Sequence, residues 1–155
     1  MALKLLFLVC LMVAVMAAPM AEAQLGIISS LLGLIRIQGT LYCTPNGNMG
    51  VNGTSTPVFS NALVQLQCGS GNVVSSATTN SSGIFSIVLD PLHFVLSSLL
   101  SDCKLVVSTP LSTCNASLPS AGGLLSSLQF IGNTVLGLLN ISNIIPSGFQ
   151  FLPSL

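Results

Sequence analysis

Ionisable side chains are scarce in this chain. Its 155 residues include three Lys or Arg, three Asp or Glu and one His, so charged residues make up 4% of the total. Phosphate backbones and anionic lipid surfaces are bound through clusters of Lys and Arg, which this sequence does not contain. We therefore expect no nucleic-acid partner and no charge-driven attack on membranes.

The same scarcity leaves few groups for catalysis. His93 is the only imidazole and there is no G-x-S-x-G motif, which argues against a serine hydrolase. Asp90 is expected to cap a helix that has Pro91 at its first position, and Asp102 is expected to lie at the surface. The glycine groups lack the lysine of a phosphate-binding loop. We predict that the protein is not an enzyme and needs no cofactor.

Residues 1–23 have the features of a secretory signal peptide. Lys4 supplies the positive charge, residues Leu5 to Ala18 are all apolar, and Ala21-Glu22-Ala23 is a small-residue cleavage pattern. The apolar run is shorter than the ~18 to 20 residues that span a bilayer. We expect cleavage after Ala23, export from the cell and no transmembrane segment.

Four cysteines follow this segment, namely Cys43, Cys68, Cys103 and Cys114. An even number of cysteines in a secreted chain predicts two disulfides, with three possible connectivities. There is no C-x-x-C pair, and the single histidine, His93, has no closely spaced pair of metal ligands near it, so no metal site is predicted.

The sequence also contains four N-x-S/T sequons, which are the acceptor motifs for N-linked glycans. They begin at Asn52, Asn80, Asn115 and Asn140. We expect some of them to carry sugar and therefore to be exposed.

Alternation of apolar and polar residues predicts several β-strands. It is clearest over residues 34–43, where Ile35, Ile37 and Leu41 share one face and Arg36 lies on the other. Residues 44–57 have the Pro, Asn and Gly content of a loop. Further strands are expected at residues 62–68, 73–79, 84–89 and 103–108. Short strands separated by turns indicate an antiparallel β-sandwich or barrel.

Three other segments, residues 27–35, 92–102 and 121–141, have apolar residues at helical spacing. Two interpretations are open: the helices bury their apolar faces on the sheet, or they expose them to lipid, wax or another copy. Burial of one leucine is worth about 1.5 to 3 kcal/mol, so leucines left in water would be a functional surface. The candidate surface residues are Ile27, Ile28, Leu31, Leu32, Leu124, Leu128, Ile131, Val135 and Leu136.

Motifs within residues 34–117 resemble those of plant Ole e 1-like extracellular proteins. Residues 37–43 are similar to the V-x-G-x-V-x-C first strand of that family, residues 62–68 to its second cysteine-bearing strand, and residues 79–85 to its T-x-x-x-G-x-F hairpin. The resemblance implies an antiparallel β-sandwich or barrel, here with short amphipathic helices added at both ends and between strands.

The resemblance also implies a disulfide pairing of Cys43 with Cys114 and of Cys68 with Cys103. The chain departs from the family pattern in two places, since Cys43 stands alone where the family has C-x-x-C, and the late cysteine of the family is absent. Both departures fit the loss of one complete bridge.

These inferences divide the chain into four parts. They are a signal peptide at residues 1–23, an amphipathic segment at 24–33, a disulfide-bonded β domain at 34–117 and a Leu/Ser-rich amphipathic extension at 118–155.

Within the family, the uncharged Ser/Leu-rich composition and the segment from Gln24 to Ile28 are similar to leaf-surface members secreted by glandular trichomes. That resemblance implies a secreted protein of the leaf surface or apoplast that inhibits spore germination or infection by fungi and oomycetes. The expected partners are a microbial spore, cuticle or lipid surface, and self-association is possible. The alternatives are an extracellular structural protein that binds wall carbohydrate or lipid, and a lipid carrier with a leucine-lined cavity.

Overall fold

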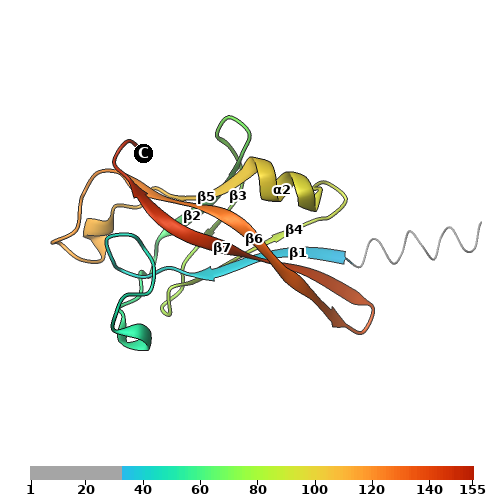
Figure 1. Cartoon of the computed structure of the whole chain (residues 1–155), viewed down its shortest axis with the longest axis horizontal. Helices are drawn as coiled ribbons and strands as arrows, with labels where there is room; N and C mark the ends of the chain where they lie inside the picture. The colour runs from blue at the N-terminus through green and yellow to red at the C-terminus, as the bar shows by residue number, and fades with distance from the viewer. Residues whose placement is uncertain (1–32) are drawn as a thin grey trace, which may run out of the picture.

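The computed structural model describes residues 33–155, in which seven strands form one sheet (Figure 1). The strands are β1 (Gly33–Thr40), β2 (Leu63–Cys68), β3 (Asn72–Thr78), β4 (Ile84–Leu89), β5 (Cys103–Val107), β6 (Gly123–Leu136) and β7 (Leu139–Leu152). The helical elements are α2 (Leu96–Asp102) and the short 3₁₀ turns η1 (Gly53–Ser55) and η2 (Leu111–Thr113). None of the helices in this part of the chain has the length and apolar character needed to cross a membrane.

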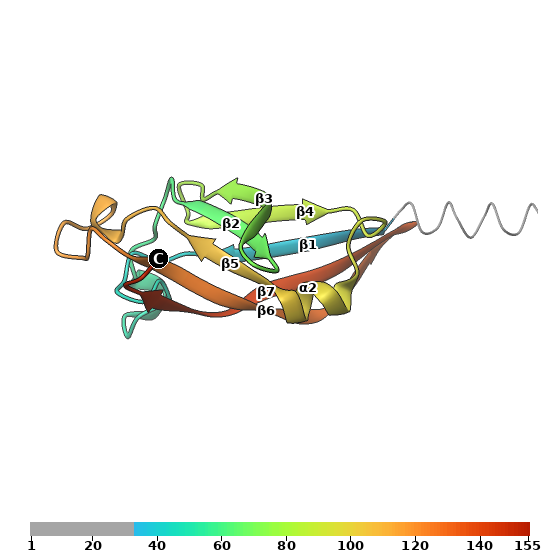
Figure 2. The same ribbon diagram turned by 90° about the horizontal axis from the view of Figure 1, so that it is seen from above.

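The spatial order of the strands is β3-β2-β5-β6-β7-β1-β4. Neighbouring strands are antiparallel, except that β1 runs parallel to β7. The two edge strands, β3 and β4, lie next to each other, so the sheet curls into a nearly closed, barrel-like shape (Figure 2). The prediction of a mainly β protein with a barrel or sandwich architecture is confirmed.

The predicted strands are present, with ends that differ from the prediction by at most three residues. In β1, Ile35 and Ile37 are buried, as is Leu41 just beyond it, whereas Gln38 is exposed. Burial of one face in each strand joins these residues into a single core. Its largest fully buried side chains are Phe59, Phe85, Ile37, Leu41, Leu66, Leu99, Leu105, Leu124 and Ile144.

The helix predicted for residues 121–141 is wrong, because this segment forms β6 and the start of β7. The two strands make a long hairpin in the middle of the sheet, between β5 and β1. The alternation is disguised in the sequence because Ser126 occupies an inward position and is 1% exposed. Its hydroxyl donates to the Ser127 carbonyl oxygen at 2.8 Å and accepts from the Gly148 amide at 3.3 Å, so burial leaves no polar atom unpaired.

Bulges hide the strand pattern further. The register of β6 against β7 shifts between Ser126 and Leu128 and again between Phe130 and Gly132. A bulge changes which face the following residues occupy, so apolar side chains appear at intervals of three and four. That spacing is also the signature of a helix.

The two remaining helix predictions are corrected in part. Of residues 92–102, only Leu96–Asp102 are helical, and the residue before the helix is Val95. Asp90 therefore does not cap the helix; its carboxylate accepts a hydrogen bond from the Leu92 amide at 2.9 Å and closes a local turn. Residues 33–35 of the first segment belong to β1, while residues 24–32 lie outside the described part of the chain.

Candidate functional site

The β6–β7 hairpin continues past the rest of the sheet at one end of the molecule (Figure 1). β5 pairs with β6 only from Leu124 to Ser126, so the far half of β6 has β7 as its one strand neighbour. At this end Val135, Leu136 and Leu138 are 68%, 61% and 83% exposed. We call residues 130–138 the hairpin end.

The turn that joins β6 to β7 has a leucine at a position where polar residues are common. Gly137 has a φ of 61°, while Leu138 after it is not among the residues with positive φ, which is the pattern of a type II′ hairpin turn. Polar residues such as Asn, Asp or Ser commonly follow glycine in such turns. Here a leucine takes that place and points an apolar side chain into solvent.

Phe130 and Ile131 extend the exposed apolar surface along β6. No Asp, Glu, Lys, Arg or His occurs anywhere from Gly123 to Leu152. The nearby cation is Arg36 on β1, whose Nη2 donates a hydrogen bond to Asn143 Oδ1 at 3.0 Å. The surface is therefore apolar and uncharged.

The residues predicted to form an apolar surface fall into three groups. Leu124 and Leu128 do not lie at the surface, because both side chains are buried in the core cluster. Leu124 lies where β5 and β7 flank β6, and Leu128 lies further along β6, opposite Pro146 of β7. The exposed members are Ile131, Val135 and Leu136. The other predicted members, Ile27, Ile28, Leu31 and Leu32, lie outside the described residues.

Sequence analysis missed Phe130 and Leu138. The signal that identifies Leu138 is the step Gly137-Leu138 between two runs with strand-forming residues, which is a turn pattern. It was obscured by the helical spacing of the leucines around it.

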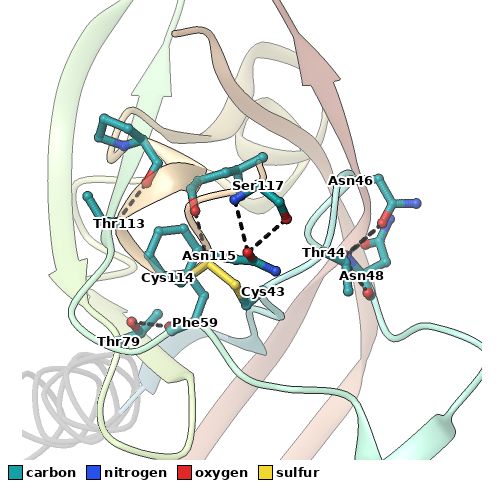
Figure 3. Close-up of a disulfide and its surroundings, with 12 residues drawn as sticks. Cys43, Thr44, Asn46, Asn48, Phe59, Thr79, Thr113, Cys114, Asn115 and Ser117 are labelled. Carbon is teal, nitrogen blue, oxygen red and sulfur yellow. Dashed lines mark hydrogen bonds between the residues drawn. A yellow bond between two sulfur atoms is a disulfide. The ribbon is translucent and has the colours of Figure 1, made fainter. Parts of the chain in front are cut away.

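At the opposite end of the molecule, the Cys43–Cys114 disulfide joins the loop at residues 41–62 to the loop at residues 108–122 (Figure 3). We call these loops and the β3–β4 turn beside them the loop end. The second bridge, Cys68–Cys103, joins the ends of the paired strands β2 and β5. These are the pairs that the family resemblance implies. The Leu41 amide donates a hydrogen bond to the Gly83 carbonyl oxygen at 2.8 Å, which holds the β3–β4 turn at the loop end.

All four sequon asparagines are exposed. Three of them belong to segments of the loop end, which are the 44–57 loop with Asn52, the β3–β4 turn with Asn80 and the segment after Cys114 with Asn115 (Figure 3). The Asn115 Oδ1 accepts hydrogen bonds from the Ser117 amide at 3.0 Å and from its hydroxyl at 2.8 Å (Figure 3). Both bonds use the oxygen and leave the side-chain nitrogen, to which a glycan attaches, free of them. Asn140 lies instead in β7, beside the hairpin end.

An open cavity of about 440 Å³ lies beside α2. Its walls include the Cys68–Cys103 disulfide, Phe94 and Leu99, with His93 and Asp102 also lining it. The His93 Nε2 is 3.8 Å from Asp90 Oδ2 in an exposed pair. No cluster of three metal-ligating side chains occurs within residues 33–155.

These features define a class: a small, disulfide-linked β protein whose distinctive surface is apolar and uncharged. A family model described as phylloplanin antifungal protein matches residues 31–155. The chain is also 44% identical to phylloplanin of Nicotiana tabacum over 148 residues, which cover 93% of this chain and 92% of the relative. The chain therefore belongs to the phylloplanin family.

Proposed function

We propose that the protein is a secreted defence protein of plant surfaces that inhibits spore germination or infection by fungi and oomycetes. It acts by apolar contact with a spore, cuticle or lipid surface and not by catalysis. The observation that carries this proposal is the uncharged, exposed hairpin end in a chain that belongs to an antifungal family.

Export to the leaf surface or apoplast is part of the proposal. It is supported by the signal-like residues 1–23 and by two disulfides, which form and persist in oxidising compartments. Attachment of glycans at the exposed sequons of the loop end fits the same compartment.

The test is a germination assay on fungal and oomycete spores with the purified, folded protein. We expect fewer germinated spores and shorter germ tubes, with an effect that scales with protein per spore surface. A contact mechanism is stoichiometric, so longer preincubation at a fixed dose should add little. Reduced and alkylated protein is the control and should lose the effect. Unchanged germination at every dose would contradict the proposal, and inhibition that grows steadily with preincubation at low dose would indicate catalysis.

A second candidate is an extracellular protein that binds wall carbohydrate or lipid. The observation in its favour is the cavity beside α2, whose volume lies within the range of small-molecule sites. Native mass spectrometry of protein extracted from its source should then show a bound acyl chain or oligosaccharide. Ligand-free protein in the same spectra would count against this candidate.

A further inference from the structure

We propose that the hairpin end binds an uncharged hydrocarbon surface, such as a solid wax, while the loop end faces water. This inference rests on the proposed function for its setting, because it specifies which element makes the apolar contact and with what. It concerns residues 130–138 and the turn residue Leu138 in particular.

The hairpin end exposes apolar side chains that the fold does not use. Val135, Leu136 and Leu138 lie between Ser126, the last β6 residue that pairs with β5, and Asn140, the first β7 residue that pairs with β1. Their exposure in water is unfavourable, and each would gain free energy on entering an apolar phase. Because Val135 and Leu136 are adjacent in a strand, they point to opposite faces, and Leu138 projects from the turn between the strands. Apolar side chains therefore project from both faces and from the turn, with the exposed Asn140 opposite Val135. This arrangement suits contact through the tip of the hairpin better than packing of one face on a protein.

Several polar side chains near the hairpin end are hydrogen-bonded within the protein. The Asn143 Nδ2 donates to Thr134 Oγ1 at 2.8 Å and to the Gly132 carbonyl oxygen at 3.2 Å, and its Oδ1 accepts from Arg36. The Ser142 hydroxyl donates to Asn133 Oδ1 at 3.1 Å. Transfer of a polar group out of water costs least when its hydrogen bonds are made within the protein. The network therefore lowers the desolvation cost of contact with hydrocarbon.

The lack of charge on the hairpin indicates which kind of surface it binds. The hairpin has no ionisable side chain, and the cation beside it, Arg36, is engaged with Asn143. Anionic phospholipid headgroups are attracted by clusters of basic residues. Such a cluster is missing here, whereas a hydrocarbon surface offers no charge and requires none. The geometry thus favours a neutral wax over a phospholipid membrane.

The experiment compares adsorption of the secreted protein and a triple variant, Val135→Gln, Leu136→Thr and Leu138→Asn, on a quartz crystal microbalance. The surfaces are a paraffin film, a hydroxyl-terminated monolayer, and bilayers of zwitterionic and of anionic phospholipid. We expect the protein to adsorb on paraffin more strongly than on the other three surfaces. The triple variant should need at least tenfold more protein for half-maximal coverage of paraffin.

A matched control removes the same number of exposed aliphatic side chains from other parts of the molecule. It carries Val51→Gln, Val73→Thr and Val88→Thr, which alter exposed positions in the 44–57 loop, β3 and β4. Its half-maximal concentration should stay within twofold of the unmodified protein. Equal losses in the two triple variants would show that general surface apolarity, and not the hairpin end, drives adsorption.

A single substitution guards against misfolding of the triple variant. Leu138→Lys changes only the exposed turn residue, so circular dichroism and melting should be unchanged while paraffin adsorption falls at least fivefold. Unchanged adsorption of this folded variant would overturn the proposal. So would stronger binding of the protein to either phospholipid bilayer than to paraffin. A dimer in size-exclusion chromatography that Leu138→Lys converts to a monomer would also overturn it, since the hairpin end would then bind a second copy.

The germination assay on the same variants separates this inference from the proposed function. If Leu138→Lys loses adsorption but inhibits germination normally, the hydrocarbon site stands and apolar contact is not how germination is blocked. If the unmodified protein adsorbs but has no effect on spores, the site stands and the defence function fails. If Leu138→Lys loses germination inhibition but adsorbs on paraffin normally, the hydrocarbon site is contradicted and the defence function stands.

Discussion

Thr79 illustrates how a single buried polar side chain organises a turn. It is 2% exposed, and its hydroxyl donates to the Phe59 carbonyl oxygen at 2.7 Å and accepts from the Ala62 amide at 2.9 Å. The side chain thereby joins the end of β3 to the segment that precedes β2. Both backbone groups would lie unpaired in the core without it.

We predict that Thr79→Val destabilises the protein by roughly 1 to 3 kcal/mol, because valine has the same shape but leaves a buried donor and a buried acceptor without partners. Urea unfolding followed by circular dichroism measures the change. Thr78→Val, at an exposed position of β3, is the control and should change the free energy of unfolding by no more than about 0.5 kcal/mol. Similar losses for the two variants would mean that the hydrogen bonds of Thr79 contribute nothing specific.

Gly83 is the glycine of the T-x-x-x-G-x-F motif that begins at Thr79. It has a φ of 74°, and a Cβ there would lie 2.6 Å from the Leu41 carbonyl oxygen. A side chain is thus excluded both by backbone conformation and by space. The third motif residue, Phe85, is buried and packs edge-on against Phe149 with ring centroids 6.5 Å apart. The motif is therefore explained by packing and turn geometry, with no need for a catalytic role.

At the scale of elements, the β6–β7 hairpin has two parts with different environments. Its β6 strand pairs with β5 from Leu124 to Ser126, its β7 strand pairs with β1 from Asn140 to Ile144, and it supplies core side chains that include Leu128 at 7% exposure. Around Gly137, between the stretches that pair with β5 and β1, its apolar side chains are exposed. One continuous hairpin thus serves as the centre of the fold and as the proposed contact surface.

This division predicts opposite outcomes for two leucine-to-aspartate substitutions in the same strand. Leu128→Asp places a carboxylate in the core and should cost more than about 3 kcal/mol, so little folded protein is secreted. Leu136→Asp lies in solvent and should leave stability within about 0.5 kcal/mol of the unmodified protein, with poorer adsorption on paraffin. Secreted yield and thermal melting measure both. A stable Leu128→Asp protein, or an unfolded Leu136→Asp protein, would show that the hairpin is arranged differently.

At the scale of the whole molecule, the two ends have different chemistry. The loop end holds three of the four sequons and the Cys43–Cys114 bridge, and the hairpin end holds a group of exposed aliphatic side chains that includes Val135, Leu136 and Leu138. The Cys43–Cys114 bridge spans a sequence separation of 71 residues, against 35 for Cys68–Cys103. In the chain-entropy account, a bridge that closes a longer loop restricts the unfolded chain more.

We predict that the double variant Cys43→Ala, Cys114→Ala loses about 2 to 4 kcal/mol of stability. Differential scanning calorimetry should show a lower melting temperature, and adding a reductant should lower it less than it lowers that of the unmodified protein, because one bridge remains. An unchanged melting temperature would mean that strand pairing alone holds the loop end in place.

The strands from β1 to β5 were predictable from sequence because each is a short run that either alternates apolar and polar residues or is rich in β-branched residues, with turn residues nearby. The lack of charge, and the partners it argues against, follow from composition alone. Both kinds of property depend on residues that are neighbours in the chain, so no knowledge of packing is required.

Tertiary structure alone decided that residues 123–152 form strands and which of their leucines are buried. Ser126 is accommodated in the core by the Gly148 amide, 22 residues further along the chain, and no local pattern reveals that partner. Leu128 and Leu136 likewise occur in similar apolar surroundings in the sequence, yet only Leu128 is buried in the core. Burial is a property of the neighbours that folding brings together, and for this hairpin those neighbours come from distant parts of the chain.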